Sequence, residues 1–481
     1  MPHATKEVFL ASLECPTKAW LFRNSEGTRA LSEAERLRMD EGREVGAKAR
    51  EAIPGGVFPA PLGSTSAAER TASLIADGSV EVVYEATFEV GGLVAKADIL
   101  RRQPTGWTII EVKMSSNEKP ELVHDLAYTV MVARRAGLLV SRAVLVLVSK
   151  EYRLGLLPNE FFVEVDRTAE VNALVPQFVA HWDRVSGMVL RAEKPEPALI
   201  FACRSCQYYE VDCLGKGLEN PLFDLPRLSQ SKFEKLKALG VHSIGDIPAS
   251  FDLTDNQERV RNAVASGEPW QSPDLATALD QVTWPAFFLD FETTSTAQPL
   301  FENVAPFEQL PTQYSIHLYE DAETELGHKE FLADHRVDER GRLAARLVAD
   351  LEGSGSIVVY SSFEKRIINY LRALFPELAN QLAGFIERLF DLEALIKGNC
   401  YHPEFRGMSS IKRTLPALVP GMGYDSLSIG SGEDASALFA RMARGERSWS
   451  ECGKMRNGLL KYCGQDTLAM VRLVQALRRL C

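Results

Sequence analysis

Three cysteines crowd one short segment of this chain and set the strongest constraint on how it folds. Cys203, Cys206 and Cys213 stand in FACRSCQYYEVDC among polar neighbours, which would make a poor core for ordinary buried thiols. Three thiolates leave a tetrahedral metal site or a cubane cluster one ligand short, and zinc and iron–sulfur sites both accept four cysteines. Cys15 is the candidate fourth ligand, so the fold must bring together two segments about 190 residues apart.

Composition places the chain among ordinary globular proteins. At roughly 150 residues per domain, its 481 residues correspond to two or three domains. Hydrophobic residues make up 46% and charged residues 25%, which excludes disordered, collagen-like and disulfide-stapled chains. The net charge of −11 argues against a general polyanion-binding surface, but not against carboxylate-held metals that meet a phosphodiester locally. Without a long apolar run or a signal-peptide pattern, we expect no membrane contact and a cytoplasmic location.

Hydrophobic periodicity predicts a first α/β domain over residues 1–222. A helix is expected at 31–53, ended by Pro54-Gly55-Gly56. Three strand-like runs follow, separated by Gly-Gly and Pro-Thr-Gly turns: VEVVYEATF, VAKADILRR and WTIIEVKM. A helix at 119–137 then leads to AVLVLVS, an apolar strand of the kind that is buried on both faces.

The remaining sequence predicts a connecting segment and a second α/β domain. In residues 223–280, LSQSKFEKLKALGVHSIGDIP predicts two short helices around a glycine-containing turn. This segment is either a helical linker, which the pattern favours, or a helix-hairpin-helix-like element that touches a DNA backbone. Over residues 281–481, strands are expected at FFLDFETT, QYSIHLYE and SIVVYSS, with helices at 338–352, 364–374, 435–444 and 457–479.

A first acidic constellation lies on two neighbouring strands of the first domain. Asp98 stands in VAKADILRR, and Glu111 and Lys113 stand in WTIIEVKM. Residues two apart share one face of a strand, so Glu111 and Lys113 point the same way, and Asp98 can face them from the next strand. Two carboxylates on one face suit Mg²⁺ or Mn²⁺, and the lysine can polarise an attacking water.

A second acidic constellation lies in the second domain. Asp290 and Glu292 are two apart in FFLDFETT, and an Asp-Phe-Glu run inside an apolar strand is costly to bury without a cation. Tyr462 precedes Asp466 by four residues, which places both on one helix face. Two further acidic residues follow apolar runs: Glu364 at the start of an expected helix, and Asp391 in RLFDLEALI.

The first set of motifs resembles the iron–sulfur branch of the RecB-like PD-(D/E)XK nucleases, which includes CRISPR-associated and AddB-type members. The resemblance rests on Cys15 in CPTKAW, the D…ExK pattern and the cysteine trio. It implies a 4Fe–4S cluster held by Cys15, Cys203, Cys206 and Cys213, and catalysis by Asp98, Glu111 and Lys113. Two features depart from that family. Gly46 stands where its members carry a histidine on the first helix, with Glu44, Glu51 or Glu85 as candidate substitutes. The helix after Lys113 carries Asp125 and Tyr128 but no glutamine.

The second set resembles the tyrosine-type DEDD exonucleases of the RNase H-like fold. This resemblance implies two divalent ions held by Asp290, Glu292, Glu364 and Asp466, with Tyr462 positioning the nucleophilic water. Glu364 stands where most members have aspartate and is favoured over Asp391 as the acid of the second motif. Residues 284–475 further resemble an uncharacterised bacterial family that joins a RecB-like nuclease to an RNase H-like exonuclease domain. In that family Gln313 and His317 follow the first motif. They can either contact the nucleic-acid end or serve in packing.

Together these features predict a two-site nuclease that hydrolyses phosphodiester bonds. The expected cofactors are a 4Fe–4S cluster and Mg²⁺ or Mn²⁺, and single-stranded or end-exposed DNA is the favoured substrate. The alternatives are a ribonuclease, or a nucleic-acid-binding module with one inactive site. The glycine-rich stretches lack the Gly-Lys-Ser/Thr of a Walker loop. Unwinding would therefore need a separate helicase, and a defence-system partner is a further possibility.

Overall fold

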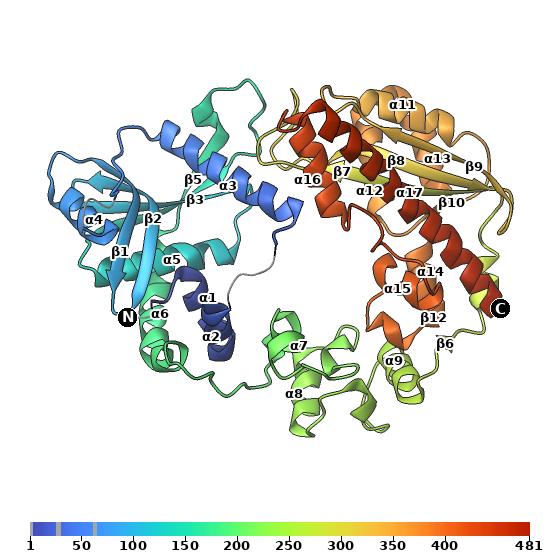
Figure 1. Ribbon diagram of the computed structural model, residues 1–481, viewed down its shortest axis with the longest axis horizontal. Coiled ribbons are helices and arrows are strands. Elements are labelled where there is room, and N and C mark those ends of the chain that lie inside the picture. Colours follow the sequence, from blue (N-terminus) through green and yellow to red (C-terminus); the bar gives the residue numbers. More distant parts are fainter. Residues whose placement is uncertain (1–2, 26–29, 61–64) are drawn as a thin grey trace. The chain divides into compact units, whose positions relative to one another are not determined.

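The computed structural model describes residues 3–25, 30–60 and 65–481, and the chain folds into two compact units (Figure 1). The N-terminal unit comprises Met1–Leu214 together with Thr296–Glu308, and the C-terminal unit comprises Gly215–Ser295 and Gln309–Cys481. Both units combine helices with a mixed or mainly antiparallel sheet, so the α/β class expected from the sequence is confirmed.

The predicted division at 1–222, 223–280 and 281–481 differs from these units. Residues 215–280 belong to the C-terminal unit: the Asp224 carboxylate pairs with Arg406 at 2.9 Å, and Trp270 pairs with Tyr401 in a short antiparallel ladder. The excursion 296–308 belongs to the N-terminal unit, where the Ala297 amide donates to Glu41 Oε1 at 3.1 Å. Long-range polar contacts of this kind leave no local trace in the sequence.

The N-terminal sheet follows the predicted order of elements. Its five strands lie in sequence order, and only β3 and β4 run parallel, joined by the crossover helix α5. The strands are β1 (Val82–Val90), β2 (Leu93–Gln103), β3 (Gly106–Lys113), β4 (Val140–Val148) and β5 (Phe162–Asp166). The helices are α1 (Lys6–Glu14), α2 (Pro16–Asn24), α3 (Glu33–Ala52), α4 (Ala67–Ala76), α5 (Pro120–Arg135), α6 (Thr168–Val189) and α7 (Tyr209–Asp212).

Two apolar cores cover the two faces of this sheet. On one face, α1, α5 and α6 pack around the fully buried Tyr128, whose hydroxyl donates to Val94 O at 2.8 Å. On the other face, Ala49 of α3 packs with Ile99 and Ile110. In the RecB-like nucleases, the glutamine that follows the lysine would lie on the helix corresponding to α5. In this chain, the Tyr128 side chain of α5 is buried in the core. Both faces of the central strands are covered, which explains the nearly continuous apolar run of β4.

The C-terminal sheet has the order β11-β10-β7-β8-β9, with β7 at its centre. Strand β7 (Ala286–Thr294) pairs antiparallel with β8 (Leu310–Tyr319) and parallel with β10 (Ile357–Val359). The sheet also contains β9 (Glu325–Leu332) and β11 (Leu389–Asp391), and β6 (Trp270–Gln271) and β12 (Cys400–Tyr401) form a separate two-stranded sheet. The first helices of this unit are α8 (Gln230–Ala238), α9 (Asp255–Ser266), α10 (Leu275–Leu279), α11 (Arg340–Asp350), α12 (Phe363–Leu374) and α13 (Ala379–Glu387).

The last helices bring the C-terminal residues onto the sheet. They are α14 (Leu392–Asn399), α15 (Ile411–Leu418), α16 (Gly432–Ala443) and α17 (Trp449–Leu480). Helix α17 begins eight residues before the predicted start at 457, because Ser448 and Glu451 form a capping box at its N-terminus. It packs on β7 and β8. In the described ranges, no helix combines the length and the apolar character that crossing a bilayer would require.

Candidate functional site

Three carboxylates converge in the C-terminal unit, as the sequence predicts. Asp290 and Glu292 share one face of β7, and Asp466 projects from α17. One ligand oxygen from each lies within 4.8 Å of the others. In the described part of the chain, no other set of three histidine, cysteine, aspartate or glutamate ligands meets this spacing. The central strand and the long C-terminal helix thus build an all-oxygen donor set, the kind that Mg²⁺ and Mn²⁺ prefer.

The carboxyl groups of this site resist ionisation. Burial, and then the charge of Asp466, raise the pKa of Glu292 to about 8. Burial also raises the pKa of Asp466 to about 6, and it raises that of Asp290 well above its usual value, with Asp466, Glu292 and Glu364 adding repulsion. Like charges held together away from water carry this cost unless a cation neutralises them.

Glu364 is outside the set within 4.8 Å, but its charge acts on Asp290 and Glu292. It is the second residue of α12, is 2% exposed, and its Oε2 is buried without a hydrogen-bond partner. Burial raises its pKa to about 7. Its rival Asp391 instead caps α14, accepting a hydrogen bond from the Ala394 amide at 2.8 Å. The position of Glu364 therefore favours it over Asp391, and its orphaned oxygen suits a cation.

The tyrosine that touches Asp466 is not the one that the sequence singled out. Tyr424, in the loop between α15 and α16, donates its hydroxyl hydrogen to Asp466 Oδ1 at 2.5 Å. Tyr462 lies one turn before Asp466 on α17 and is 4% exposed, with its ring centre 6.0 Å from that of Tyr424. Burial raises the pKa of both hydroxyls, so both stay protonated. The helical spacing identified Tyr462, but no local pattern marks Tyr424, which lies 42 residues before Asp466.

Two more side chains complete the surroundings of the carboxylates. The Cys463 thiol donates weakly to Asp290, at 3.6 Å from Oδ2 and 3.7 Å from the backbone oxygen. The Lys412 ammonium, from α15, lies 5.4 Å from the Tyr424 ring centre and 5.8 Å from that of Tyr462. Neither residue belongs to the predicted motif.

Gln313 and His317 lie in the interior of the unit. Gln313 is 1% exposed and donates to the Leu459 carbonyl at 2.9 Å. His317 Nδ1 lies 2.8 Å from Thr467 Oγ1, and its ring stacks on that of His328. Burial lowers the pKa of His317 to about 4, so the ring is neutral. These contacts favour the packing alternative over contact with a nucleic-acid end.

The N-terminal unit brings Asp98, Glu111 and Lys113 together, as the sequence predicts. Asp98 Oδ2 accepts a hydrogen bond from the Val112 amide at 2.8 Å, between the two residues of the ExK pair. Burial, and then repulsion from Glu111, raise the pKa of Asp98 to about 7. Lys113 Nζ lies 3.1 Å from Glu111 Oε1 and also contacts Asp125 on α5.

A second lysine enters this site from the N-terminal helix. Lys6 of α1 places its Nζ 2.6 Å from Glu111 Oε1 and 3.9 Å from Asp125 Oδ2. Glu111 is 2% exposed, and its Oε2 is buried without a hydrogen-bond partner. Within the described residues, Asp98, Glu111 and Asp125 do not bring three ligand oxygens to within 4.8 Å. This site therefore differs from the carboxylate site of the C-terminal unit, because two lysines pair with its acidic side chains.

The position of the missing histidine lies beside Asp98. Gly46 of α3 lines the same pocket as Asp98 and Glu85. A Cβ at Gly46 would meet only Arg50 Nη1, at 3.5 Å, so a side chain has room there. Of the candidate substitutes, Glu85 lines the pocket but pairs with Arg50 at 3.5 Å, and Glu44 accepts a hydrogen bond from Gln298 at 3.0 Å.

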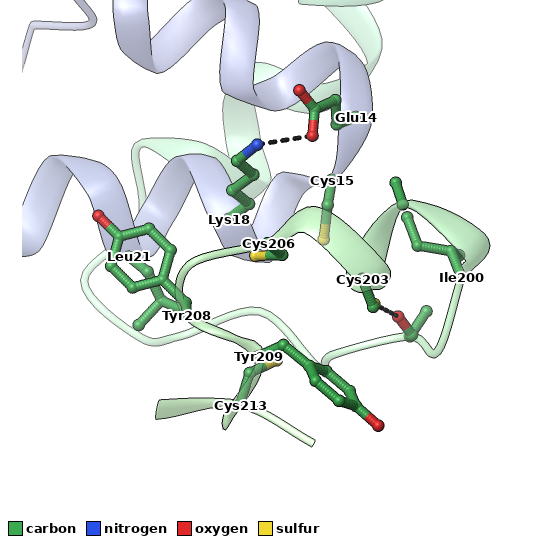
Figure 2. A pocket seen from close by; sticks show the side chains of 12 residues that line it. Glu14, Cys15, Lys18, Leu21, Ile200, Cys203, Cys206, Tyr208, Tyr209 and Cys213 are labelled. Atoms are coloured by element: carbon green, nitrogen blue, oxygen red, sulfur yellow. Dashed lines mark hydrogen bonds and ion pairs between the residues drawn. The ribbon is translucent and has the colours of Figure 1, made fainter. Parts of the chain in front are cut away.

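The four predicted cysteines line one pocket, in which the labelled side chains surround a common space (Figure 2). Cys15 connects α1 to α2, and Cys203, Cys206 and Cys213 come from the short turns around α7. All four are free thiols. Burial raises the pKa of Cys203, and the other three thiols raise it further, which shows their mutual proximity.

The donor set of four thiols suits a metal group, and zinc and iron–sulfur clusters both accept it. In the part of the chain that the structure describes, no three of these sulfurs lie within 4.8 Å of one another. The indole of Trp20 in α2 donates to the carbonyl of Arg191, which follows α6, at 3.0 Å.

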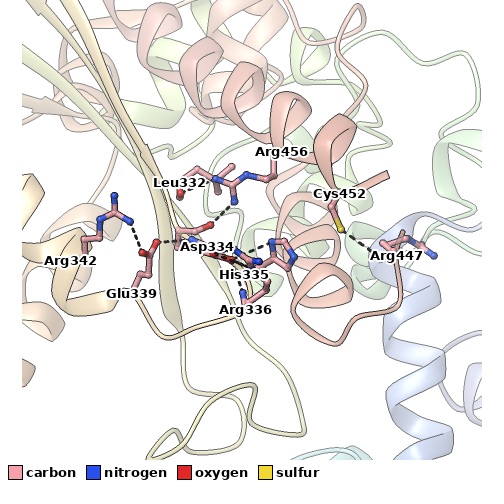
Figure 3. Close-up of polar contacts among 10 residues, drawn as sticks. Leu332, Asp334, His335, Arg336, Glu339, Arg342, Arg447, Cys452 and Arg456 are labelled. Atoms are coloured by element: carbon pink, nitrogen blue, oxygen red, sulfur yellow. Dashed lines mark hydrogen bonds and ion pairs between the residues drawn. The ribbon is translucent and has the colours of Figure 1, made fainter. Parts of the chain in front are cut away.

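A separate pocket of the C-terminal unit is rich in arginine (Figure 3). Arg336 pairs with Asp334 at 2.5 Å, and Arg456 donates to the Ala333 carbonyl at 2.7 Å. Trp449, at the N-terminus of α17, lines the same pocket and is 81% exposed. The sequence did not single out this group, because its members come from β9, the following loop, α11 and α17.

Comparisons with known proteins give no activity for any of these sites. A family model described as a domain of unknown function (DUF2779) matches residues 287–410, a range that includes Asp290, Glu292 and Glu364. The chain is 26% identical over 206 residues to the uncharacterized protein MG366 of Mycoplasma genitalium. It is 27% identical over 208 residues to the uncharacterized MG366 homolog of Mycoplasma pneumoniae. Each match covers 39% of this chain and only 31% of the relative.

Proposed function

We propose that this chain is a divalent-metal-dependent nuclease whose C-terminal unit removes nucleotides from the 3′ end of a nucleic-acid strand. The observation that carries the proposal is the convergence of Asp290, Glu292 and Asp466 within 4.8 Å, beside the buried Glu364. The mixed five-stranded sheet that holds Asp290 and Glu292 is compatible with an RNase H-like domain. The four carboxyl groups have raised pKa values because burial and mutual repulsion disfavour their ionised forms. A bound cation would offset that repulsion.

The residues of the C-terminal site divide into two roles. Asp290, Glu292, Glu364 and Asp466 would hold Mg²⁺ or Mn²⁺, which supplies a nucleophilic water at neutral pH and neutralises developing charge. Tyr424 orients the Asp466 carboxylate through its hydroxyl. Tyr462 stays protonated and can donate a hydrogen bond to the water or to the substrate.

For the N-terminal unit we propose a PD-(D/E)XK-type site closed by a 4Fe–4S cluster. Support comes from Asp98, Glu111 and Lys113 on adjacent strands, and from four free thiols that line one pocket. Such a cluster would cross-link the two ends of the unit and restrict the unfolded chain. The ion pairs of Lys6 and Lys113 with Glu111 also favour a second candidate, a unit that binds phosphates without cutting.

One assay separates these functions. End-labelled single-stranded DNA, duplex DNA and RNA are incubated with the protein in Mg²⁺ or Mn²⁺, with free and blocked 3′ ends. We expect stepwise shortening of free 3′ ends that is lost in Asp290→Asn and retained in Lys113→Met. DNA is the favoured substrate, and exclusive cleavage of RNA would establish the ribonuclease alternative.

A residual activity in Asp290→Asn would belong to the N-terminal site. If that activity disappears in Lys113→Met, the N-terminal unit also cuts. If Lys113→Met changes only nucleic-acid binding, the binding role applies. The proposed nuclease function is wrong if the wild-type protein degrades none of these substrates with either ion.

A further inference from the structure

Lys412 occupies a defined place beside the C-terminal carboxylates. It is the second residue of α15, and its side chain is exposed to solvent. Its Nζ donates to the Gly430 carbonyl at 2.7 Å and stands over the rings of Tyr424 and Tyr462, at 5.4 and 5.8 Å from their centres. A carbonyl and two aromatic faces therefore fix the ammonium in position while leaving its charge intact.

The charge of Lys412 reaches the carboxylates, although the ammonium pairs with none of them. It opposes the effect of burial by lowering the pKa values of Glu292 and Asp466. Among the described residues, however, no carboxylate oxygen lies within 4.0 Å of Lys412 Nζ. Lys6 behaves differently in the N-terminal unit, where it lies 2.6 Å from Glu111. A lysine that served only to neutralise the site would be expected to pair directly, as Lys6 does.

We infer that Lys412 is a phosphate-binding residue, whose ammonium contacts a non-bridging oxygen of the nucleic-acid strand entering the carboxylate site. The inference rests on the proposed nuclease function and adds the group that receives the substrate. An ammonium has three N–H donors, and only one is engaged by Gly430. A lysine bound by neutral groups near a buried acidic site offsets the repulsion that the carboxylates exert on a phosphate.

The contact would recognise the backbone rather than the base. A lysine is a point charge for phosphate, without the fork geometry that reads base edges. Backbone contacts add affinity without sequence information. We therefore expect Lys412 to contribute equally to DNA and RNA, and the choice between them to lie with other residues.

Salt-dependent binding tests this role without relying on turnover. Wild type, Lys412→Met and Lys412→Arg are titrated with fluorescent oligo(dT) and oligo(U) in Ca²⁺ at a series of NaCl concentrations. Methionine keeps the length of the side chain over the tyrosine rings and removes the charge. Lys397→Met is the matched control, because Lys397 pairs with Glu393 at 2.9 Å on the same unit. Binding of Mn²⁺, measured from the free ion, reports the integrity of the carboxylate site.

We expect Lys412→Met to bind both oligomers roughly tenfold more weakly at low salt, the size of one charge-assisted contact. Its plot of log affinity against log salt should be shallower by about 0.7, the loss of one phosphate contact on a single strand. Lys412→Arg should recover most of the slope. Mn²⁺ should bind Lys412→Met at least as tightly as wild type, because a nearby positive charge is gone.

Three results would overturn the inference, and they are distinguishable. If wild type binds and degrades the oligomers and Lys412→Met has the same affinity and salt slope, Lys412 does not bind phosphate and the nuclease function stands. If wild type binds Mn²⁺ but neither binds nor degrades any oligomer, the proposed function fails and the role of Lys412 fails with it. Weaker Mn²⁺ binding in Lys412→Met would also contradict the inference, since it would assign the lysine a purely structural role.

Discussion

The Lys6 ammonium lies 2.6 Å from Glu111 Oε1, although 105 residues separate the two in sequence. Lys113 Nζ approaches the same oxygen at 3.1 Å, so two cations share one buried carboxylate. Lys6 belongs to α1, and Cys15 immediately follows that helix. One end of α1 therefore reaches the Asp98–Glu111–Lys113 site, and the other end reaches the thiol pocket.

The first prediction concerns this contact. Lys6→Met should lower the free energy of unfolding of the N-terminal unit by about 1–3 kcal/mol, because it removes a charged partner from a buried carboxylate. Chemical denaturation followed by tryptophan fluorescence measures the loss. The control is Lys96→Met, whose exposed pair with Glu85 at 3.3 Å should contribute no more than about 1 kcal/mol. Equal effects of the two substitutions would contradict the proposed importance of Lys6.

The second prediction concerns pH. Burial raises the pKa values of Glu292 to about 8, Glu364 to about 7 and Asp466 to about 6, above those of the unfolded chain. The folded protein thus holds more protons than the unfolded one from about pH 4 to pH 8, and stability falls as pH rises through this window. In chelator, the melting temperature should drop between about pH 5 and pH 8. Mn²⁺ should reduce the drop, and a melting temperature that rises with pH in chelator would contradict the prediction.

The third prediction separates a ligand from a cap. Asp290→Asn should reduce 3′-end degradation roughly a hundredfold or more, because charge stabilisation by bound metal is worth several kcal/mol. Asp391→Asn makes the same chemical change at the N-cap of α14, where asparagine serves as well as aspartate. That variant should keep near-normal activity in the same assay. If both variants lose comparable activity, the assignment of Asp290 as a ligand and of Asp391 as a helix cap is wrong.

The fourth prediction concerns the two tyrosines. Tyr424→Phe should weaken Mn²⁺ binding roughly 10–100-fold, as losing a hydrogen bond to a metal-ligating group commonly does. Tyr462→Phe should leave Mn²⁺ affinity near that of wild type, because Tyr424 is the residue whose hydroxyl contacts Asp466. Isothermal titration of both variants gives the comparison. The reverse order of effects would show that Tyr462, and not Tyr424, supports Asp466.

The fifth prediction concerns the thiol pocket. Anaerobically purified protein should contain iron and acid-labile sulfide, and Cys206→Ser should lose both and melt at a lower temperature. Cys481→Ser is the matched control, because Cys481 is the exposed last residue and lies outside the pocket. One equivalent of zinc without iron would overturn the cluster and leave a four-cysteine site. Full metal content in Cys206→Ser would exclude Cys206 as a ligand.

Local patterns were sufficient to predict much of the architecture. The alternation around Asp98 and Glu111 and the apolar run of FFLDFETT identified β2, β3 and β7, because strand periodicity is visible in neighbouring residues. The start of α17 was predicted eight residues too late, since a capping box extends the helix.

The sequence by itself determined which residue types stand two or four positions apart, and this spacing brought Asp290 to Glu292 and Tyr462 to the face of Asp466. Only the tertiary structure decided that Lys6 pairs with Glu111 and that Tyr424 holds Asp466. The physical reason is that the backbone repeats of a helix or strand dictate short-range geometry. Contacts across 105 or 42 residues depend instead on how whole elements pack, which no single segment encodes.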